Sequence, residues 1–488
     1  MMWLRNRLFL LSYFAVLAVF VVIGCSSKED PSETLAVCGN HSCGELIMVT
    51  TDTTSDGFQY LDPVQSPDGT RIMFTADWWA IPTERDPGDE PYVTNRQILI
   101  MPLPQLFEPK EPEESLEVQG AELVLLNEYT LHMGGAGATI VLIPADIQNE
   151  RKASPKWITD NRILFSYLTN RGFRLFSADI TTPGSANVDG VMLIDGLDTG
   201  LFYNGAPMRG DNQDGGFDFQ ILDPAVSPDG RWAVCTFFAS RVNIITDGER
   251  EYFEFLGTQS ALIAVDLWTL GDGNGYDTAW HYLTGFYSNL RTPAWSPDGR
   301  RIVFSGGMDV GGGTGIGTEL FLIDFDPEAA ASGTSVLDDG LTRLTFTRYT
   351  DGDPITGVLN DQPAFTNDGS AVYFVSTRRA PSITLHDRNI WKVPADGSLD
   401  PEIYYFTRSD DWTPSVMADG SLLLSSQLGF PTEMLDRLEE EAYQRYKLEN
   451  ETLDRGWTEV EMREMAAGER DLLSFFEGVM SHLYIFRP

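Results

Sequence analysis

The sequence predicts an all-β protein, a six-bladed β-propeller, because one short phrase recurs along its 488 residues. The clearest copy occupies residues 293–304 and centres on Ser-Pro-Asp-Gly at 296–299. In such a tight turn, proline presets one backbone dihedral and glycine accepts a positive φ. Apolar β-forming residues stand on both sides of the turn. Each copy therefore reads as a strand, a turn and a second strand.

The phrase occurs in six ordered copies, of which four are close and two are degenerate. Each copy begins with a proline, has an aspartate in its turn and continues into an apolar strand. The prolines are Pro63, Pro155, Pro224, Pro293, Pro363 and Pro414, and the turn aspartates are Asp68, Asp160, Asp229, Asp298, Asp368 and Asp419. Self-similarity of this kind indicates a repeat architecture.

Two weaker phrases complete each unit. An alternating strand follows most copies, as at residues 319–324 and 389–394, and a further short strand closes several units, as at residues 281–284 and 404–407. Each unit thus offers four strands, which is the composition of one propeller blade. Propellers usually contain roughly four to eight blades, and the six copies predict six.

These phrases resemble the TolB-like β-propeller repeat family. The resemblance rests on the Ser-Pro-Asp-Gly phrase, the apolar strand after it, and the tails Thr-Asn-Arg-Gly at 169–172 and Ser-Thr-Arg at 376–378. It covers residues 45–488 and implies the six-bladed fold. It implies no particular activity, since this superfold hosts binders, scaffolds and enzymes alike. TolB carries an additional N-terminal α/β domain that the resemblance does not include, so it implies no role in the Tol–Pal system.

The first residues resemble a bacterial lipoprotein signal peptide, which we assign to residues 1–25. A basic start is followed by an almost wholly apolar run at 8–24, and Val-Ile-Gly-Cys at 22–25 resembles a lipobox. That resemblance implies that Cys25 is lipidated and becomes the mature N-terminus. An uncleaved membrane anchor remains an alternative. Residues 26–44 then form a tether, and Ser26 after the cysteine implies, by analogy, the outer membrane of the cell envelope.

The two ends of the folded region are expected to share one blade. The strand at residues 45–50 precedes the first copy, and the last copy lacks a complete set of strands until residues 483–486. Pairing these strands would remove an open sheet edge. Residues 431–479 differ in composition and predict an insertion of two amphipathic helices. Its apolar positions include Tyr443, Leu448, Leu472, Leu473, Phe475 and Phe476.

The formal net charge of −38 bounds the choice of partner. A field of this sign opposes nucleic acid and anionic membrane surfaces, so no nucleic-acid partner is expected. It suits cations or basic partners, and a solvated acidic surface explains it equally. Acidic, glycine-containing loops at 211–215, 272–277 and 351–353 offer the oxygen ligands of calcium. Ordinary turn chemistry explains them as well, so calcium stays open and no other cofactor is expected.

The cysteines offer little chemistry. Cys38 and Cys43 flank a four-residue loop and could close a small disulfide in an oxidising envelope. A metal site with His41 would lack a fourth ligand. Cys235 stands in an apolar strand and is expected to be an inert buried thiol.

The loop with the most distinctive composition is residues 377–388. It carries Arg378, Arg379, His386 and Arg388 in an acidic chain, so an anion or a partner's carboxylate could dock there. Pairing of Arg378 and Arg388 with carboxylates of their own blade is the alternative.

The sequence as a whole favours a non-catalytic lipoprotein of the bacterial cell envelope. Its propeller would bind or scaffold a protein or another envelope ligand, and its membrane contact would be the lipid on Cys25. The chain contains no Gly-x-Ser-x-Gly elbow, which a serine hydrolase of the α/β class requires. The alternative is an enzyme, a lyase or hydrolase acting on carbohydrate at the channel mouth.

Overall fold

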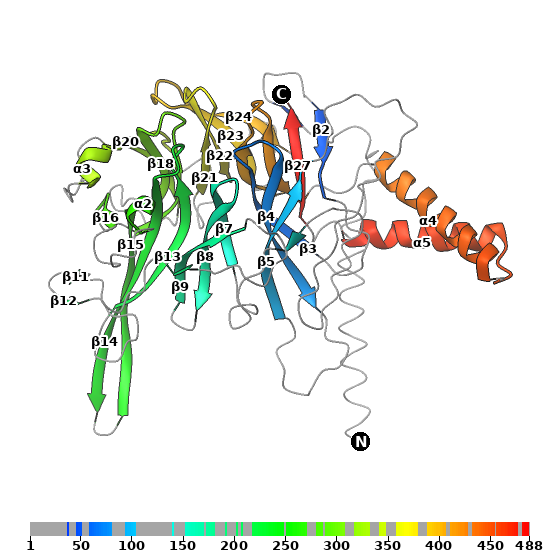
Figure 1. Ribbon diagram of the computed structural model, residues 1–488, viewed down its shortest axis with the longest axis horizontal. Helices are drawn as coiled ribbons and strands as arrows, with labels where there is room; N and C mark the ends of the chain where they lie inside the picture. Colours follow the sequence, from blue (N-terminus) through cyan, green and yellow to red (C-terminus); the bar gives the residue numbers. More distant parts are fainter. Residues whose placement is uncertain are drawn as a thin grey trace. The chain divides into compact units, whose positions relative to one another are not determined.

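A computed structural model shows how the repeats fold. It describes residues 37–38, 45–50, 58–80, 93–103, 139–140, 152–169, 172–180, 191–192, 202–203, 206–207, 217–247, 250–270, 280–285, 288–307, 317–331, 341–347, 358–378, 388–406, 410–427, 432–453, 455–476 and 481–487. Contacts divide the chain into two units, residues 1–35 with 429–474, and residues 36–428 with 475–488. The second unit contains all the described strands (Figure 1).

Within the described residues, the second unit holds six antiparallel sheets of four or five strands and one two-stranded pair. In spatial order the first three sheets are β3 (Phe58–Gln65), β4 (Arg71–Ala80), β5 (Val93–Pro102), β6 (Thr139–Ile140); β7 (Lys152–Thr159), β8 (Arg162–Thr169), β9 (Gly172–Asp179), β10 (Val191–Met192); and β13 (Phe217–Val226), β14 (Trp232–Asp247), β15 (Arg250–Asp266), β16 (Trp280–Tyr282). The separate pair is β11 (Phe202–Tyr203) with β12 (Ala206–Pro207).

The fourth sheet repeats the four-strand pattern, and the last two add strands from elsewhere in the chain. They are β17 (Ser288–Trp295), β18 (Arg301–Gly307), β19 (Glu319–Asp324), β20 (Thr342–Arg343); β21 (Asn360–Phe365), β22 (Ala371–Ser376), β23 (Asn389–Pro394), β24 (Glu402–Phe406), β1 (Val37–Cys38); and β25 (Asp411–Val416), β26 (Leu422–Ser426), β27 (His482–Arg487), β2 (Glu45–Met48). Short helices α2 (Leu267–Leu270) and α3 (Pro327–Ala331) follow β15 and β19.

The sheets contact one another in a closed cyclic order. Strands β3, β7, β13, β17, β21 and β25 are the first strands of their sheets, and each contacts the first strand of the next sheet. The last of them, β25, contacts β3 and so returns to the first sheet. The middle strands β14 and β15 extend well past this arrangement as a long hairpin (Figure 1).

The repeated turn has the geometry that the sequence predicts. In the copy at Asp68, the hydroxyl of Ser66 donates to Oδ1 of Asp68 at 2.5 Å, and the Thr70 amide donates to the same oxygen at 2.9 Å. These donors, the Ser66 hydroxyl first, lower the pKa of Asp68 to about 2. Gly69 follows with φ +74°, a conformation that residues with a Cβ rarely adopt.

The two chain ends meet in the sixth sheet, which confirms the predicted pairing. Ile47 of β2 pairs with Ile485 of β27, and the Val49 amide donates to the Leu483 carbonyl at 2.7 Å. Strand β2 thereby covers the edge of β27. One detail differs from expectation: Val37–Cys38, inside the expected tether of residues 26–44, pairs with β24 as β1.

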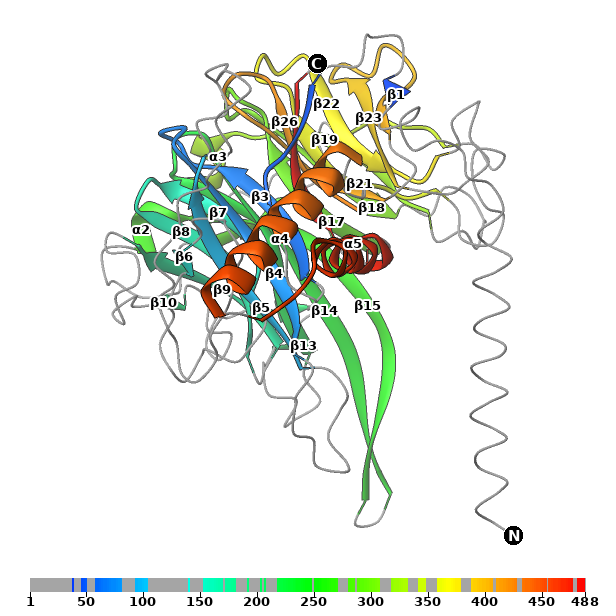
Figure 2. The ribbon, with the colours of Figure 1, turned by 90° about the vertical axis from the view of Figure 1, so that its right-hand side faces the viewer.

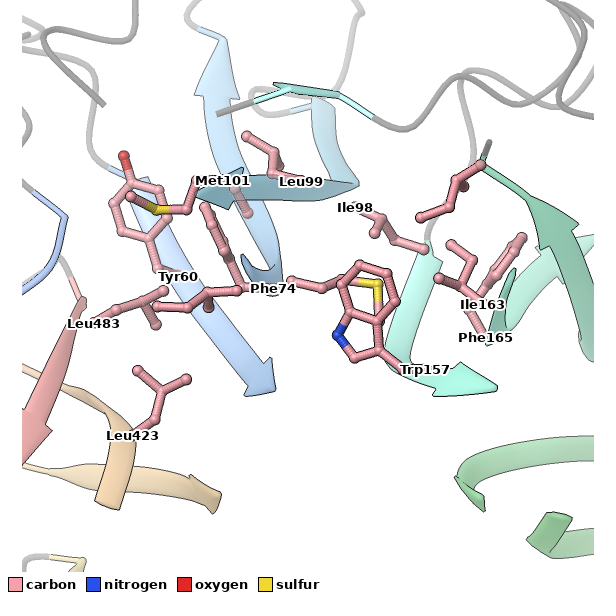
Figure 3. Close-up of a cluster of buried hydrophobic side chains, with 14 of the residues drawn as sticks. Tyr60, Phe74, Ile98, Leu99, Met101, Trp157, Ile163, Phe165, Leu423 and Leu483 are labelled. Carbon is pink, nitrogen blue, oxygen red and sulfur yellow. The ribbon is translucent and has the colours of Figure 1, made fainter. Parts of the chain in front are cut away.

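Buried side chains join the sixth, first and second sheets. Leu423 and Leu483 of the sixth sheet, Tyr60 and Phe74 of the first, and Trp157 of the second belong to one apolar cluster (Figure 3). Similar clusters lie between the other neighbouring sheets. Burial of apolar area between sheets is therefore the main force that holds them together.

The insertion forms two helices, as predicted, α4 (Thr432–Leu453) and α5 (Glu459–Phe476) (Figure 2). They pack against each other through Ala442 and Tyr443 of α4 and Met462 and Ala466 of α5. Leu448, one of the apolar positions of the insertion, is 65% exposed. None of the helices in the described part of the chain is both long and apolar enough to span a membrane.

Deletion of residues 45–50 should destabilise the second unit. The deletion uncovers the edge of β27 and removes the buried contacts of β2, so we expect the free energy of unfolding to fall by on the order of 3 kcal/mol. Urea unfolding followed by far-ultraviolet circular dichroism measures this. Deletion of residues 26–31 is the matched control. Equal urea midpoints for the two deletions would show that β2 does not stabilise the sixth sheet.

Candidate functional site

One residue in each first strand has an unusual backbone conformation. These residues stand directly before the repeat prolines and have φ between 46° and 53°. They are Asp62, Ser154, Asp223, Thr292, Gln362 and Thr413. Residues with a Cβ rarely adopt a positive φ, and a following proline favours extended backbone instead. Such strain persists only where the surrounding structure imposes it.

A β-bulge accompanies each of these residues. In the third sheet, Leu222 pairs with Thr236 and Ala225 with Val234, so two residues, Asp223 and Pro224, stand opposite the single residue Cys235. The same two-against-one register recurs at the other five positions. A bulge bends its strand and re-aims a side chain. Here it brings the residue before each proline to the inner face of the cyclic arrangement, where these residues contact one another.

The six residues form a closed ring of hydrogen bonds, which we call the channel ring. At five junctions, the backbone amide of one residue donates to the side chain of another. These bonds are Asp62 to Thr413 (3.3 Å), Ser154 to Asp62 (3.2 Å), Thr292 to Asp223 (3.3 Å), Gln362 to Thr292 (3.2 Å) and Thr413 to Gln362 (2.8 Å). At the sixth, the Ser154 hydroxyl donates to Asp223 at 3.3 Å. The ring therefore links all six sheets through one polar residue each.

The channel ring lies between two cavities. One, the proline-side cavity, has a volume of about 450 Å³, and five of the six repeat prolines, all but Pro155, contribute to its walls with Trp295, Phe365 and Lys156. The other, the arginine-side cavity, measures about 440 Å³ and includes Arg291, Arg388 and Trp412 in its lining. Five of the six ring residues line both cavities. The ring is therefore the neck between them.

Charge is concentrated at this neck. Burial, and then the carboxylates of Asp361 and Asp62, raise the pKa of Asp223 to about 6, against the opposing influence of the Thr292 amide and Arg291. Asp361 is held by Arg291, whose Nε lies 2.9 Å from Oδ2, and by the Thr292 hydroxyl at 2.6 Å. Burial lowers the pKa of Lys156, while Asp62 and Asp223 oppose that shift.

The loop predicted to bind an anion is only partly described. Arg388 lines the arginine-side cavity, where its guanidinium also bonds to Asp410 at 3.0 Å. Arg378 places its guanidinium over the Trp391 ring, 5.6 Å from the centroid, and its amide donates to the Ser376 hydroxyl. Arg379 and His386 lie outside the described residues. Of the four residues, the structure thus places one, Arg388, at a cavity.

Other candidate residues contribute less. Cys235 is fully buried and its pKa is raised by that burial, which fits an inert thiol. His482 is 3% exposed, and burial lowers its pKa to about 4. Cys25, Cys43 and the acidic-glycine loops lie outside the described residues, as does the side chain of Cys38. Within the part of the chain that is described, no group of His, Cys, Asp and Glu side chains is placed to hold a metal ion.

Sequence reasoning missed the channel ring, although a signal was present. In all six copies, the residue before the repeat proline is polar and able to accept a hydrogen bond. The prediction was based on the turn aspartates, which lie five residues after each proline. It did not consider the residue before the proline. Lys156, one residue after its proline, was also overlooked.

Comparisons with known proteins give distant structural likeness only. No protein-family model matches the chain, and no curated protein matches it either. A puromycin-hydrolyzing peptidase of Mycobacterium tuberculosis is similar over 80% of this chain, at 14% identity and a TM-score of 0.42. TolB from Acinetobacter baumannii is similar over 73%, at 15% identity and 0.37, and a Pyrococcus horikoshii acylaminoacyl peptidase over 78%, at 11% and 0.35.

This chain spans only part of the proteins that it resembles. It covers 47% of the mycobacterial peptidase, 61% of the Acinetobacter TolB and 44% of the Pyrococcus peptidase. A function for the chain therefore has to be argued from the channel ring and its two cavities.

Replacing Thr292 by valine should weaken the channel ring. Valine keeps the shape and the β-branch, so the backbone strain is unchanged, but the hydroxyl that bonds Asp361 and the Gln362 amide is lost. We expect the free energy of unfolding to fall by about 1 to 3 kcal/mol. Thr342→Val, at an exposed site on β20, is the matched control in urea unfolding. An equal effect of both variants would contradict a stabilising role for the ring.

Asp223→Asn should stabilise the protein at neutral and higher pH. The folded state keeps the Asp223 proton up to about pH 6, whereas the unfolded chain releases it near its ordinary pKa of 3.8. The contribution of Asp223 to the free energy of unfolding is therefore complete below its ordinary pKa of 3.8. It is lost as the pH rises to about 6. Asparagine avoids the loss, so its advantage should grow with pH to about 3 kcal/mol.

Urea unfolding at about pH 4 and about pH 8 tests this pH dependence. Asp68→Asn is a useful comparison, because the pKa of Asp68 is lowered and its ionised form stabilises the fold. That variant should be less stable than the wild type at the higher pH. If Asp223→Asn lowered the free energy of unfolding by the same amount at both pH values, ionisation of Asp223 would not destabilise the folded state.

Proposed function

We propose that the second unit is a six-bladed propeller of the TolB-like type. The support is that six sheets contact one another in cyclic order. Each sheet contains one repeat, and its first strand contacts the first strands of the two neighbouring sheets. Strand β2, from near the start of the chain, pairs with β27, from near its end, in the last sheet. A closed ring of sheets requires such a pairing, because it leaves no open edge there. Radial repetition also leaves a space along the axis, where the channel ring and its cavities would lie.

The function we infer is non-catalytic binding of an envelope ligand in the proline-side cavity. The observation that carries this proposal is the lining of that cavity. Prolines, small apolar residues, Trp295 and Phe365 line it, together with the polar residues of the channel ring, Lys156, Asn367 and Ser415. Concave, mostly apolar sites with a few convergent polar groups are the usual form of a ligand pocket.

The neck carboxylates favour binding over chemistry. Asp62 accepts the Ser154 amide, and Asp223 accepts the Thr292 amide and the Ser154 hydroxyl. An acid or base in a carbohydrate-acting enzyme must instead reach the substrate. Within the described lining of either cavity, no histidine or cysteine is present to act as a nucleophile or proton carrier. These carboxylates are therefore better suited to holding the ring.

We place the protein in the bacterial cell envelope, anchored by lipid on Cys25. The support is the signal-like segment at residues 1–25 and the lipobox-like sequence that ends it. On this proposal, the partner is a protein or another component of the envelope, and the outer membrane is the expected site. A lipid anchor would keep the cavity near such partners without a membrane-spanning helix.

Filling the cavity should abolish ligand retention. Ala294 and Ala364 line the proline-side cavity, so Ala294→Trp or Ala364→Trp occupies its volume. The full chain is purified from solubilised membranes, and co-purifying molecules are identified by mass spectrometry. We expect at least one species to be retained by the wild type and lost in the filled variants. Leu399→Trp is the control, since Leu399 is 69% exposed on the surface.

Two results would contradict the proposal. Equal retention by wild type and filled variants would show that ligands bind elsewhere. Turnover of an envelope polysaccharide by the wild type, lost in the filled variants, would favour the enzyme. Cys25→Ala in the same preparation should release the protein from membranes without changing what its cavity retains.

A further inference from the structure

Lys156 distinguishes one sector of the cavity wall from the other five. It follows the repeat proline of the second sheet directly. The residues at the same place in the other sheets are Val64, Ala225, Ala294, Ala364 and Ser415. All six line the proline-side cavity. The cavity therefore carries one ammonium group in a layer that is otherwise small and uncharged.

This ammonium has no direct partner in the part of the chain that the structure describes. Among the described residues, Lys156 forms no ion pair within 4.0 Å and no hydrogen bond. Asp62 and Asp223 act on it through space but do not contact it. By contrast, Arg291 and Arg388, the cations of the arginine-side cavity, each pair with a carboxylate at 2.9 to 3.0 Å. A ligand in this cavity would therefore find Lys156 as a charged donor that has no partner among the described residues.

We propose that Lys156 binds the carboxylate of an organic ligand whose apolar part lies against the prolines, Trp295 and Phe365. The proposal rests on the binding function inferred above and specifies its chemistry. A charge-assisted hydrogen bond to a carboxylate would supply the missing partner of the ammonium. The apolar wall would bury the rest of the ligand. A small organic acid and the C-terminal carboxylate of a partner chain offer the same group.

The neighbouring acids set the conditions for this binding. Asp62 and Asp223 act electrostatically on Lys156, Asp361 acts in the same way on Asp223, and Arg291 pairs with Asp361. A bound carboxylate is repelled by ionised Asp223, whose charge is lost as the pH falls through about 6. Binding should therefore take up protons and strengthen from about pH 8 to about pH 6. The distant surface acids matter less, because salt screens charges beyond about 8 Å.

Isothermal titration calorimetry of the full chain with phenylacetate and with phenylacetamide tests the central claim. The two probes share shape and ring but differ in charge. We expect phenylacetate to bind at least about tenfold more tightly, and Lys156→Met to remove that difference. Lys447→Met, on the exposed surface of α4, should leave it unchanged. Asp223→Asn should strengthen phenylacetate binding at about pH 8 and flatten its pH dependence.

A second measurement does not depend on the variants folding. In nuclear magnetic resonance of the wild type, the Lys156 ammonium signal should titrate at higher pH when phenylacetate is present, and not with phenylacetamide. Equal affinity for the two probes, no binding of either probe or peptide, or an unmoved Lys156 titration would overturn the proposal. Acetyl-Ala-Phe with a free carboxylate, compared with acetyl-Ala-Phe amide, distinguishes the two sources of the carboxylate. Binding of the free acid favours the C-terminus of a partner chain. If this peptide does not bind but phenylacetate does, a small organic acid is favoured.

The co-purification experiment fails independently of this one. If a species is retained in the cavity but Lys156→Met also retains it and the carboxylate probes do not bind, the binding function stands and the carboxylate assignment falls. If the probes bind as expected but no envelope species is retained, the site is a carboxylate site and the envelope function falls.

Discussion

The channel ring balances a backbone strain that recurs in every sheet. A residue with a Cβ held at positive φ costs roughly 1 to 3 kcal/mol, and six such residues stand before prolines. Each residue is held by a hydrogen bond to its neighbour in the next sheet. A buried bond contributes roughly 0.5 to 1.5 kcal/mol on average. The bulged conformation is therefore stable only with the apolar packing between sheets added.

The same bulges create the site. Because each one places two residues against one, the strand bends and the residue before the proline leaves the ladder. In five of the six sheets the proline then lines the proline-side cavity, and in all six the residue after it lines that cavity. One backbone irregularity, repeated six times, thus supplies a polar neck and an apolar chamber. Among the described residues, Lys156 of the second sheet adds a positive charge to that chamber.

The turns and strands could be predicted from the sequence because their causes are local. Ser66, Asp68 and Thr70 form their hydrogen bonds within five residues, and Gly69 supplies the positive φ. The same local chemistry recurs at Asp229, Asp298 and Asp368. The pairing of residues 45–48 with 484–487 was also predictable, since an incomplete last unit requires a strand from elsewhere. Composition likewise identified the helical insertion.

The channel ring was decided by tertiary structure alone. Steric contact with the following proline opposes the positive φ that these residues adopt. The sequence of a single repeat therefore does not predict this conformation. The conformation is imposed by partners in other repeats, 51 to 351 residues apart along the chain. The sequence by itself determined the repeats, their turns and their number. Which polar residues face one another, and that Lys156 remains unpaired among the described residues, follows only when six sheets meet in cyclic order.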